Sequence, residues 1–176
     1  MSDLAKTQLP ATNMLLLERE GSVLKIWFNR PEAKNALNAE MTDDLVNVLT
    51  AVKDDRSIRT IVLRGKGGFF CAGGDIKGFK SGMQTVDAEQ VAMSNRSFGD
   101  VMIMLNEQPQ VVIILVEGAA IGGGLGLACV ADVTLVTADA RFRLSETSLG
   151  IPPAQIAPFV TERVGLTQAR RLMLTG

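Results

Sequence analysis

The stretch VVIILVEGAAIGGGLGLACVAD, residues 111–132, carries the strongest fold signal in the chain. Its first apolar run is rich in β-branched residues and almost free of polar side chains, which predicts a buried strand. The second run is rich in small residues, which predicts a buried helix. Three consecutive glycines, Gly122, Gly123 and Gly124, stand between the two runs. They allow a close backbone approach and leave outward-pointing amides at the helix start, as an oxyanion or phosphate site requires.

Strands and helices are predicted to alternate on both sides of this stretch. Asn38 is a plausible N-cap for an amphipathic helix, and Gly165 separates two short helices near the end. Predicted strands cover 14–18, 23–28, 60–63, 132–136 and 141–144, and predicted helices cover 38–54, 87–107, 156–164 and 167–174. This alternation favours an α/β fold with parallel pairing after an initial hairpin. We expect residues 1–12 to form a flexible tail and residues 13–176 to form one domain.

The composition of the 176 residues is that of an ordinary globular chain, with 47% hydrophobic and 21% charged residues. With 18 basic and 19 acidic residues the charge is nearly balanced, so no nucleic-acid partner is expected. No apolar stretch reaches the roughly 18 residues that span a bilayer, and no secretory signal is evident, so we expect no membrane partner. Two cysteines do not form a disulfide framework, and this favours a cytoplasmic location.

The absence of histidine excludes several catalytic groups from this chain. A Ser-His-Asp or Cys-His nucleophile and a His-based zinc site are ruled out, and no metal site is expected. Acid–base chemistry must therefore use Asp, Glu, Lys, Cys or backbone groups.

A second glycine-rich loop, RGKGGFFCAGGD at residues 64–75, also follows a predicted strand. Two such loops are able to direct two backbone N–H groups at one carbonyl oxygen, which is an oxyanion hole. Loss of one such donor costs about 2.7–4 kcal/mol of transition-state stabilisation. The dinucleotide fingerprint is not matched, because Leu127 stands where its third glycine belongs, and no phosphate-binding loop ending in Gly-Lys-Ser/Thr is present.

Four segments resemble the crotonase (enoyl-CoA hydratase/isomerase) superfamily. CAGGDI at 71–76, AAIGGGLGLACVAD at 119–132 and FRLSETSLGIPP at 142–153 resemble its signature segments, and NRPEAKNALN at 29–38 resembles its acyl-CoA-binding segment. The resemblance implies a ClpP/crotonase fold of stacked ββα units and an acyl-CoA thioester substrate, with no separate cofactor. It also implies a homotrimer or dimer of trimers, and a core domain truncated before the family's C-terminal helical part.

The same resemblance assigns the site residues. It implies that the backbone N–H groups of Gly74 and Gly123 form the oxyanion hole and that Glu146 is the catalytic carboxylate. The residues it assigns to substrate binding are Lys34, Ala36, Ala72, Asp75, Ile76, Lys77 and Gly122.

One departure from the family bears on the reaction. Typical hydratases of the family carry two glutamates; the second matches Glu146, whereas the first falls on Gly126. Our leading expectation is a hydratase in which Glu146 handles both water and proton. The alternatives are an isomerase that works with a single carboxylate and a catalytically silent subunit that only binds acyl-CoA.

Finer features of the sequence suggest a substrate and the roles of nearby residues. The run 145–158 is similar to hydratases of branched glutaconyl-type thioesters, including isohexenylglutaconyl-CoA hydratase of acyclic terpene breakdown. Met83, Phe98 and Met102 are candidates for an acyl pocket, although core packing is the stronger expectation for each. We expect Cys71 to be a buried thiol and Asp132 to bind backbone groups.

Overall fold

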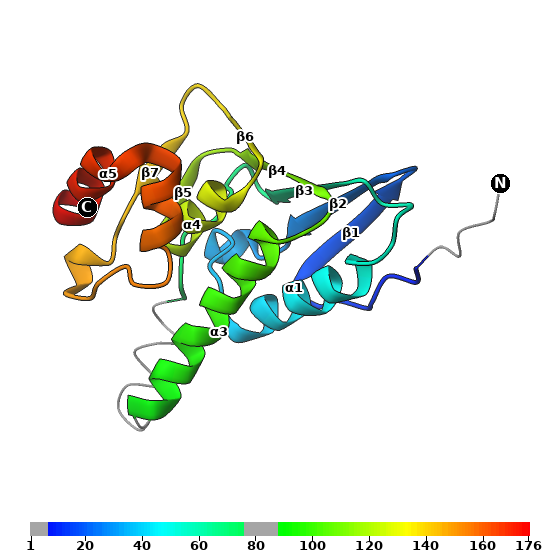
Figure 1. Cartoon of the computed structure of the whole chain (residues 1–176), viewed down its shortest axis with the longest axis horizontal. Helices are drawn as coiled ribbons and strands as arrows, with labels where there is room; N and C mark the ends of the chain where they lie inside the picture. The colour runs from blue at the N-terminus through cyan, green and yellow to red at the C-terminus, as the bar shows by residue number, and fades with distance from the viewer. Residues whose placement is uncertain (1–6, 76–87) are drawn as a thin grey trace.

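The main sheet has five strands in the order β1–β2–β3–β4–β6 (Figure 1). The computed structural model describes residues 7–75 and 88–176. The strands are β1 (Leu15–Glu20), β2 (Val23–Phe28), β3 (Thr60–Gly65), β4 (Val111–Val116) and β6 (Val133–Val136). β1 pairs with β2 as an antiparallel hairpin, and β2, β3, β4 and β6 pair in parallel. The predicted hairpin and the predicted parallel pairing are confirmed.

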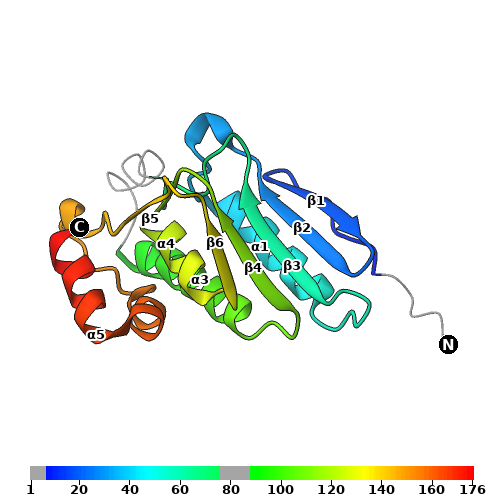
Figure 2. The same cartoon turned by 90° about the horizontal axis from the view of Figure 1, so that it is seen from above.

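Helices cover one face of this sheet (Figure 2). α1 (Ala39–Val52) packs against α3 (Ala88–Asn106), which in turn packs against α4 (Gly123–Val130). The predicted N-cap is confirmed, because Asn38 Oδ1 accepts the Met41 N–H at 2.9 Å. Alternate strand residues point toward these helices and form the core, among them Leu24, Ile26, Phe28, Ile61, Leu63, Val112 and Ile114. No helix among residues 7–75 and 88–176 is long and apolar enough to cross a membrane.

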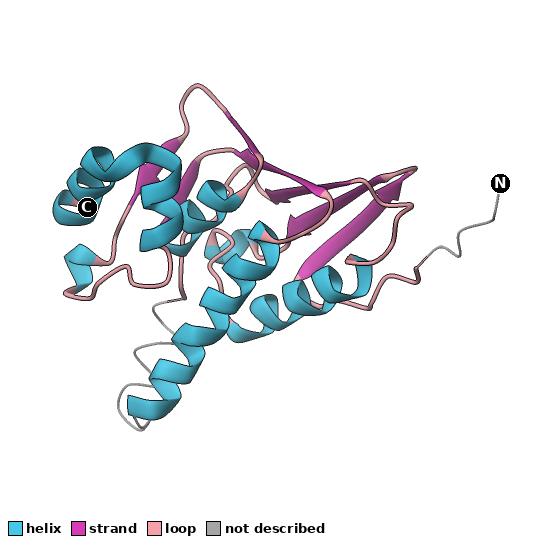
Figure 3. Ribbon diagram, in the orientation of Figure 1, coloured by secondary structure: helices cyan, strands magenta, loops and turns pink. Residues whose placement is uncertain are grey.

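A smaller sheet and a C-terminal helix complete the α/β fold (Figure 3). β5 (Ala119–Ile121) leads directly into α4 and pairs in parallel with β7 (Arg141–Arg143). The short helices η1 (Pro31–Ala33) and η2 (Thr147–Leu149) lie in loops. α5 (Ala157–Thr175) packs on α4 and is interrupted at Gly165, whose φ of 76° is not helical. The two predicted helices are therefore the two halves of α5, and the break between them lies at the predicted residue, Gly165.

The predicted N-terminal tail is only partly described. Residues 1–6 lie outside the described residues. Thr7 donates its N–H to Asp55 Oδ2 at 3.2 Å, and Thr12 Oγ1 donates to the Leu15 carbonyl at 2.8 Å. The end of this segment is therefore bonded to the loop between α1 and β3 and to the start of β1.

The loop between β2 and α1 is organised by the side chain of Asn35, which is fully buried. Its Oδ1 accepts the Arg30 N–H at 2.9 Å, and its Nδ2 donates to the carbonyls of Lys66 at 2.9 Å and Phe69 at 2.6 Å. The backbone turns through the left-handed region here, with φ of 50° at Lys34 and 54° at Asn35. Asparagine tolerates this conformation better than most residues. One side chain thus fastens the 29–38 loop to the glycine-rich loop after β3.

We expect Asn35→Ala to destabilise the protein by about 3 kcal/mol, because it leaves one donor and two acceptors buried without partners. Urea denaturation would measure this as a lower midpoint at unchanged slope. Asn47→Ala, at an exposed position of α1, is the matched control and should change stability by less than about 0.5 kcal/mol. Equal midpoints for the Asn35 variant and the wild type would contradict this account.

Candidate active site

The two glycine-rich loops lie side by side, because residues 71–75 run between Leu37 and β5. On one side, Cys71 donates its N–H to the Ala119 carbonyl at 3.1 Å and accepts the Ile121 N–H at 3.0 Å. On the other side, Leu37 donates its N–H to the Gly73 carbonyl at 2.8 Å and accepts the Asp75 N–H at 2.9 Å. The tertiary structure therefore brings together the two loops that the sequence places about 50 residues apart, each after a parallel strand whose carboxyl end meets the same sheet edge.

This close approach requires glycine at several positions. Gly73 has a φ of 86°, and a Cβ there would lie 2.7 Å from the Ile121 carbonyl oxygen. A Cβ on Gly124 would lie 2.8 Å from both the Cβ and the carbonyl oxygen of Cys71. These contacts are with backbone or short, rigid side chains, which cannot move away cheaply. Gly73 and Gly124 are thus explained by the close approach of one loop to the other.

The amides of Gly74 and Gly123 have different surroundings. Leu37 bonds to both neighbours of Gly74, and in this parallel pairing the N–H of the central residue points away from the partner strand. Gly74 is exposed, and a Cβ there would meet none of the described residues within 4 Å. Gly123 is the first residue of α4, where backbone N–H groups lack an intrahelical acceptor. The Gly74 amide therefore belongs to the segment that pairs with β5, and the Gly123 amide belongs to the helix that follows β5.

Glu146 lies directly against the glycine triplet. Its Oε1 is 2.7 Å from the place that a Cβ on Gly122 would occupy, and the φ of 52° at Gly122 also favours glycine there. Glu146 Oε2 is buried and has no hydrogen-bond partner among the described residues. Burial raises the pKa of this carboxyl, and a smaller opposing effect comes from a hydrogen bond with its own backbone. A desolvated carboxylate next to a helix N-terminus is well suited to take up and release protons.

The space beside Gly126, where typical hydratases of the family carry their first glutamate, is filled by side chains from other helices and loops. A Cβ on Gly126 would lie 2.9 Å from Ile156 Cβ and closer still to Ile156 Cγ2, and 3.0 Å from Met102 Cε. Ile156 and Met102 are both buried. An apolar side chain therefore occupies the space beside Gly126, and the sequence pattern held no signal for this contact.

The segment that the resemblance assigns to substrate binding is assembled beside Gly74. Ala72 donates its N–H to the Lys34 carbonyl at 3.0 Å, and the Lys34 ammonium lies 5.5 Å from the centre of the Phe69 ring. Arg30 bridges the Ala36 carbonyl at 2.8 Å and Asp75 Oδ2 at 2.9 Å. Ile76 and Lys77 lie outside the described residues. Sequence reasoning did not single out Arg30, although it lies within the recognised 29–38 segment.

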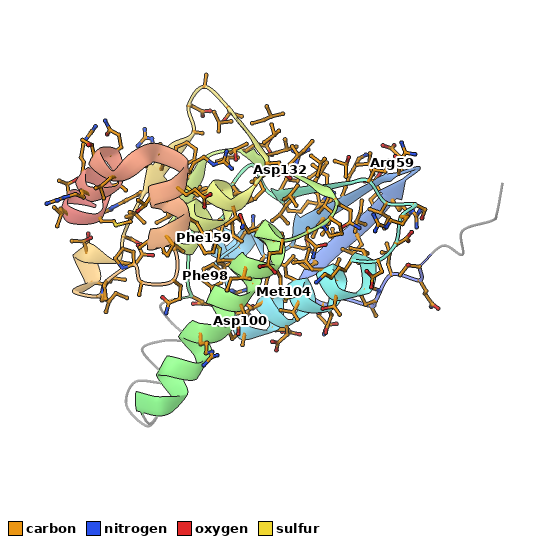
Figure 4. The ribbon with its side chains drawn as sticks, viewed as in Figure 1. Arg59, Phe98, Asp100, Met104, Asp132 and Phe159 are labelled. Atoms are coloured by element: carbon orange, nitrogen blue, oxygen red, sulfur yellow. The ribbon has the colours of Figure 1, made fainter. Side chains whose placement is uncertain are left out.

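Three of the remaining candidates, Cys71, Asp132 and Met102, have structural roles. Cys71 is fully buried, and burial raises its pKa to about 12, so it is a thiol rather than a nucleophilic thiolate. Asp132 Oδ2 accepts the Val112 N–H at 2.7 Å, which confirms the backbone role predicted for it (Figure 4). Met102 is fully buried in the core, as expected.

Phe98 is only partly buried and its ring reaches Gly123, with Cζ 3.0 Å from a Cβ placed there. Met83 lies outside the described residues.

Comparison with known proteins gives consistent matches. Residues 18–176 match the family described as enoyl-CoA hydratase/isomerase. The chain is 34% identical over 161 residues to the enoyl-CoA hydratase ACTT6 of Alternaria alternata, covering 91% of this chain and 51% of that protein. It is 33% identical over 166 residues to a short-chain-enoyl-CoA hydratase of Clostridium acetobutylicum, covering 93% and 62%. The chain therefore spans about half to three-fifths of the length of these relatives.

Solved structures match the fold closely. Pseudomonas aeruginosa AtuE superposes with a TM-score of 0.90 at 55% identity, covering 93% of this chain and 63% of that chain. An enoyl-CoA hydratase/isomerase from Marinobacter aquaeolei superposes with a TM-score of 0.88 at 48% identity, with the same coverage.

We expect Gly126→Ala to destabilise the protein by about 1–3 kcal/mol, because the new methyl group meets the rigid Ile156 side chain. This cost exceeds the gain of about 1 kcal/mol in helix propensity. Ile156→Ala alone should cost about 2–5 kcal/mol through the cavity it leaves. Thermal unfolding should show the double variant to be more stable than the two single effects predict together.

Gly99→Ala in α3 is the matched control for this prediction. A Cβ there lies 3.6 Å from Gln155 Cγ, an ordinary contact. This variant should therefore gain about 0.5–1 kcal/mol from helix propensity alone. Additive effects at positions 126 and 156 would show that the two residues are not in contact.

Proposed function

The chain belongs to the enoyl-CoA hydratase/isomerase (crotonase) family, and from this premise we propose that it adds water to the double bond of a 2-enoyl-CoA thioester. The observation that carries the proposal is the half-buried Glu146, whose Oε2 is buried and whose Oε1 lies against Gly122, the residue that precedes α4. This arrangement puts an ionisable group beside backbone amides that have no intrahelical acceptor. The two components needed are a proton carrier and a carbonyl-binding site.

In the proposed reaction the N–H groups of Gly74 and Gly123 bind the thioester carbonyl oxygen. Negative charge grows on this oxygen when water attacks C3, because the electrons of the C2–C3 double bond move toward the carbonyl to form an enolate. Hydrogen bonds aimed at the developing charge lower the barrier more than they stabilise the substrate. The N-terminus of α4 adds a partial positive charge at the same place.

Glu146 performs both proton transfers. As the carboxylate it accepts a proton from water while the water oxygen bonds to C3, and as the carboxylic acid it then returns a proton to C2. The net change is the addition of one water molecule, and Glu146 ends in its starting state. A carboxyl whose pKa is raised by burial serves both roles better than an exposed glutamate, because its pKa lies closer to the pH at which the enzyme works.

An isomerase is the second candidate, and the Gly126–Ile156 contact favours it. Ile156 supplies no group to hold water opposite Glu146. A single carboxylate suffices to move a proton from one carbon to another through the same enolate. The two reactions start from the same thioester and differ in whether oxygen enters the product.

For the substrate we propose a branched or terpenoid glutaconyl-type CoA. The proposal is supported by the similarity of the 145–158 run to hydratases of such thioesters, by the apolar Phe98 beside Gly123, and by Met102 and Ile156 beside Gly126. Lys34, Ala36, Ala72, Asp75, Ile76, Lys77 and Gly122 would contact the CoA thioester. No cofactor besides the CoA of the substrate is required.

The proposal includes a cytoplasmic location for the complete protein and its assembly as a homotrimer or dimer of trimers. A turnover screen across short, branched and terpenoid enoyl-CoA thioesters would identify the acyl group.

We expect Glu146→Gln to abolish hydration of crotonyl-CoA, because an amide cannot accept the water proton. Absorbance loss at the enoyl thioester band measures hydration, and mass spectrometry separates a hydrated product from an isomerised one. Wild-type turnover in the variant would remove Glu146 from the mechanism. Isomerised product from the wild type would establish the second candidate instead.

Stability measurements distinguish lost chemistry from lost folding in this variant. Since the folded-state pKa of Glu146 is raised, the folded protein resists ionisation. The stability present below the unfolded-state pKa is therefore lost as pH rises through the folded-state pKa. Glu146→Gln avoids this loss, so its melting temperature relative to the wild type should increase between acidic pH and pH 7. A lower melting temperature at pH 7 would indicate structural damage.

The Gly74 donor is tested by comparing Gly74→Pro with Gly74→Ala. A Cβ at position 74 meets none of the described residues within 4 Å, and of the two substitutions only proline removes the N–H. We expect kcat of the proline variant to be about 100- to 1,000-fold below that of the alanine variant, the usual effect of losing one oxyanion donor. Equal kcat values would show that this amide does not bind the carbonyl oxygen.

A further inference from the structure

The Gly74 amide has to keep one direction to bind an oxyanion, yet no side chain of residues 7–75 or 88–176 packs on its α-carbon. Gly74 is exposed, and within the part of the chain that the structure describes its Cβ position has no neighbour within 4 Å. Glycine also has the greatest backbone freedom of any residue. The constraint on its direction must therefore come from the residues on either side.

Those flanking residues are held by hydrogen bonds to Leu37 and by one guanidinium. Leu37 takes both backbone bonds, to Gly73 and from Asp75. Arg30 Nη2 donates to Asp75 Oδ2 at 2.9 Å, and Arg30 Nη1 donates to the Ala36 carbonyl at 2.8 Å. The guanidinium thus joins the two paired segments. On one segment it binds Asp75, the residue after Gly74, and on the other it binds Ala36, the residue before Leu37.

Arg30 itself is firmly placed. Its backbone N–H donates to Asn35 Oδ1, and its side chain is only 19% exposed, beside an Asp75 side chain that is 20% exposed. A planar guanidinium offers two donors at a fixed angle, whereas a lysine ammonium acts as a single point charge. The geometry at Ala36 and Asp75 uses this fork.

We infer that Arg30 is a positioning residue for the reaction, which sets the direction of the Gly74 N–H by clamping Asp75 to the segment 36–37. The inference rests on the proposed function, because it assumes that the Gly74 amide binds the thioester oxygen. Arg30 does not touch the reacting atoms.

Loss of this clamp should affect the transition state more than substrate binding. The ground-state carbonyl is a weak acceptor, whereas the enolate oxygen depends strongly on donor alignment. We therefore expect Arg30→Gln to lower kcat by about tenfold, a fraction of the effect of removing the donor outright. KM for crotonyl-CoA should change by less than about twofold, since most of the substrate contacts are unchanged.

Two further variants accompany this measurement. Arg30→Lys retains the charge and one donor, so it should restore about half of the lost activation free energy, or roughly threefold in kcat. Glu32→Gln is the matched control, because Glu32 Oε1 lies 3.8 Å from Arg30 Nε and its side chain is 72% exposed. It leaves both clamping bonds intact and should keep wild-type kcat. An unchanged kcat for Arg30→Gln, or a loss confined to KM, would overturn the inference.

A spectroscopic measurement reports on the carbonyl bond directly. Crotonyl-CoA labelled with ¹³C at the thioester carbonyl is bound to the Glu146→Gln variant, which does not turn it over, and difference infrared spectroscopy records the C=O stretch. Hydrogen bonding to the carbonyl shifts this band to lower frequency. We expect the shift to shrink when Arg30→Gln is added and to stay the same when Glu32→Gln is added.

The possible outcomes separate the inference from the proposed function. A full shift in the presence of Arg30→Gln overturns the positioning role and leaves the oxyanion site standing. A shift absent even with Arg30 in place contradicts the oxyanion site, and the inference with it. A smaller shift with unaltered thermal unfolding of the Arg30 variant supports the inference, because general structural damage would lower the melting temperature as well.

Discussion

The close contact between residues 71–74 and 119–124 is the constraint on which the rest of the structure depends. Backbone lies against backbone here, and a single methyl group at Gly73 or Gly124 would come within 3 Å of a carbonyl oxygen. Two parallel strands, β3 and β4, bring these loops to the same edge of the sheet. The proposed donors are main-chain amides in or next to this contact, so the hydrogen bonds of the flanking residues restrict their direction before a substrate binds.

The same contact determines the electrostatics of the site. Gly122 leaves room for the Glu146 carboxyl, and the surrounding protein removes water from it, which raises its pKa. Ile156 and Met102 fill the space beside Gly126 with apolar groups. In the proposed reaction Glu146 is the group that accepts and releases the proton. Hydration and isomerisation both need such a group.

A layer of polar contacts behind the glycine loops supports the site. Asn35 joins the 29–38 loop to the carbonyls of Lys66 and Phe69, and Arg30 joins this loop to Asp75. Neither side chain needs to reach a substrate to influence the reaction, because each restrains a backbone segment that carries a proposed donor or binding group. Their buried hydrogen bonds are expensive to leave unpaired, which makes this layer stiff.

The sequence by itself determined the alternation of strands and helices, the Asn38 cap, the break at Gly165 and the family, because these depend on local periodicity, caps and contiguous motifs. It also pointed to Glu146 and to the two glycine loops. Only the tertiary structure decided that Ile156 lies where a side chain at Gly126 would be, and that Arg30 clamps Asp75. Such contacts join residues 30 or more positions apart. They leave no periodic trace in a single sequence, since the partners meet only after the sheet has assembled.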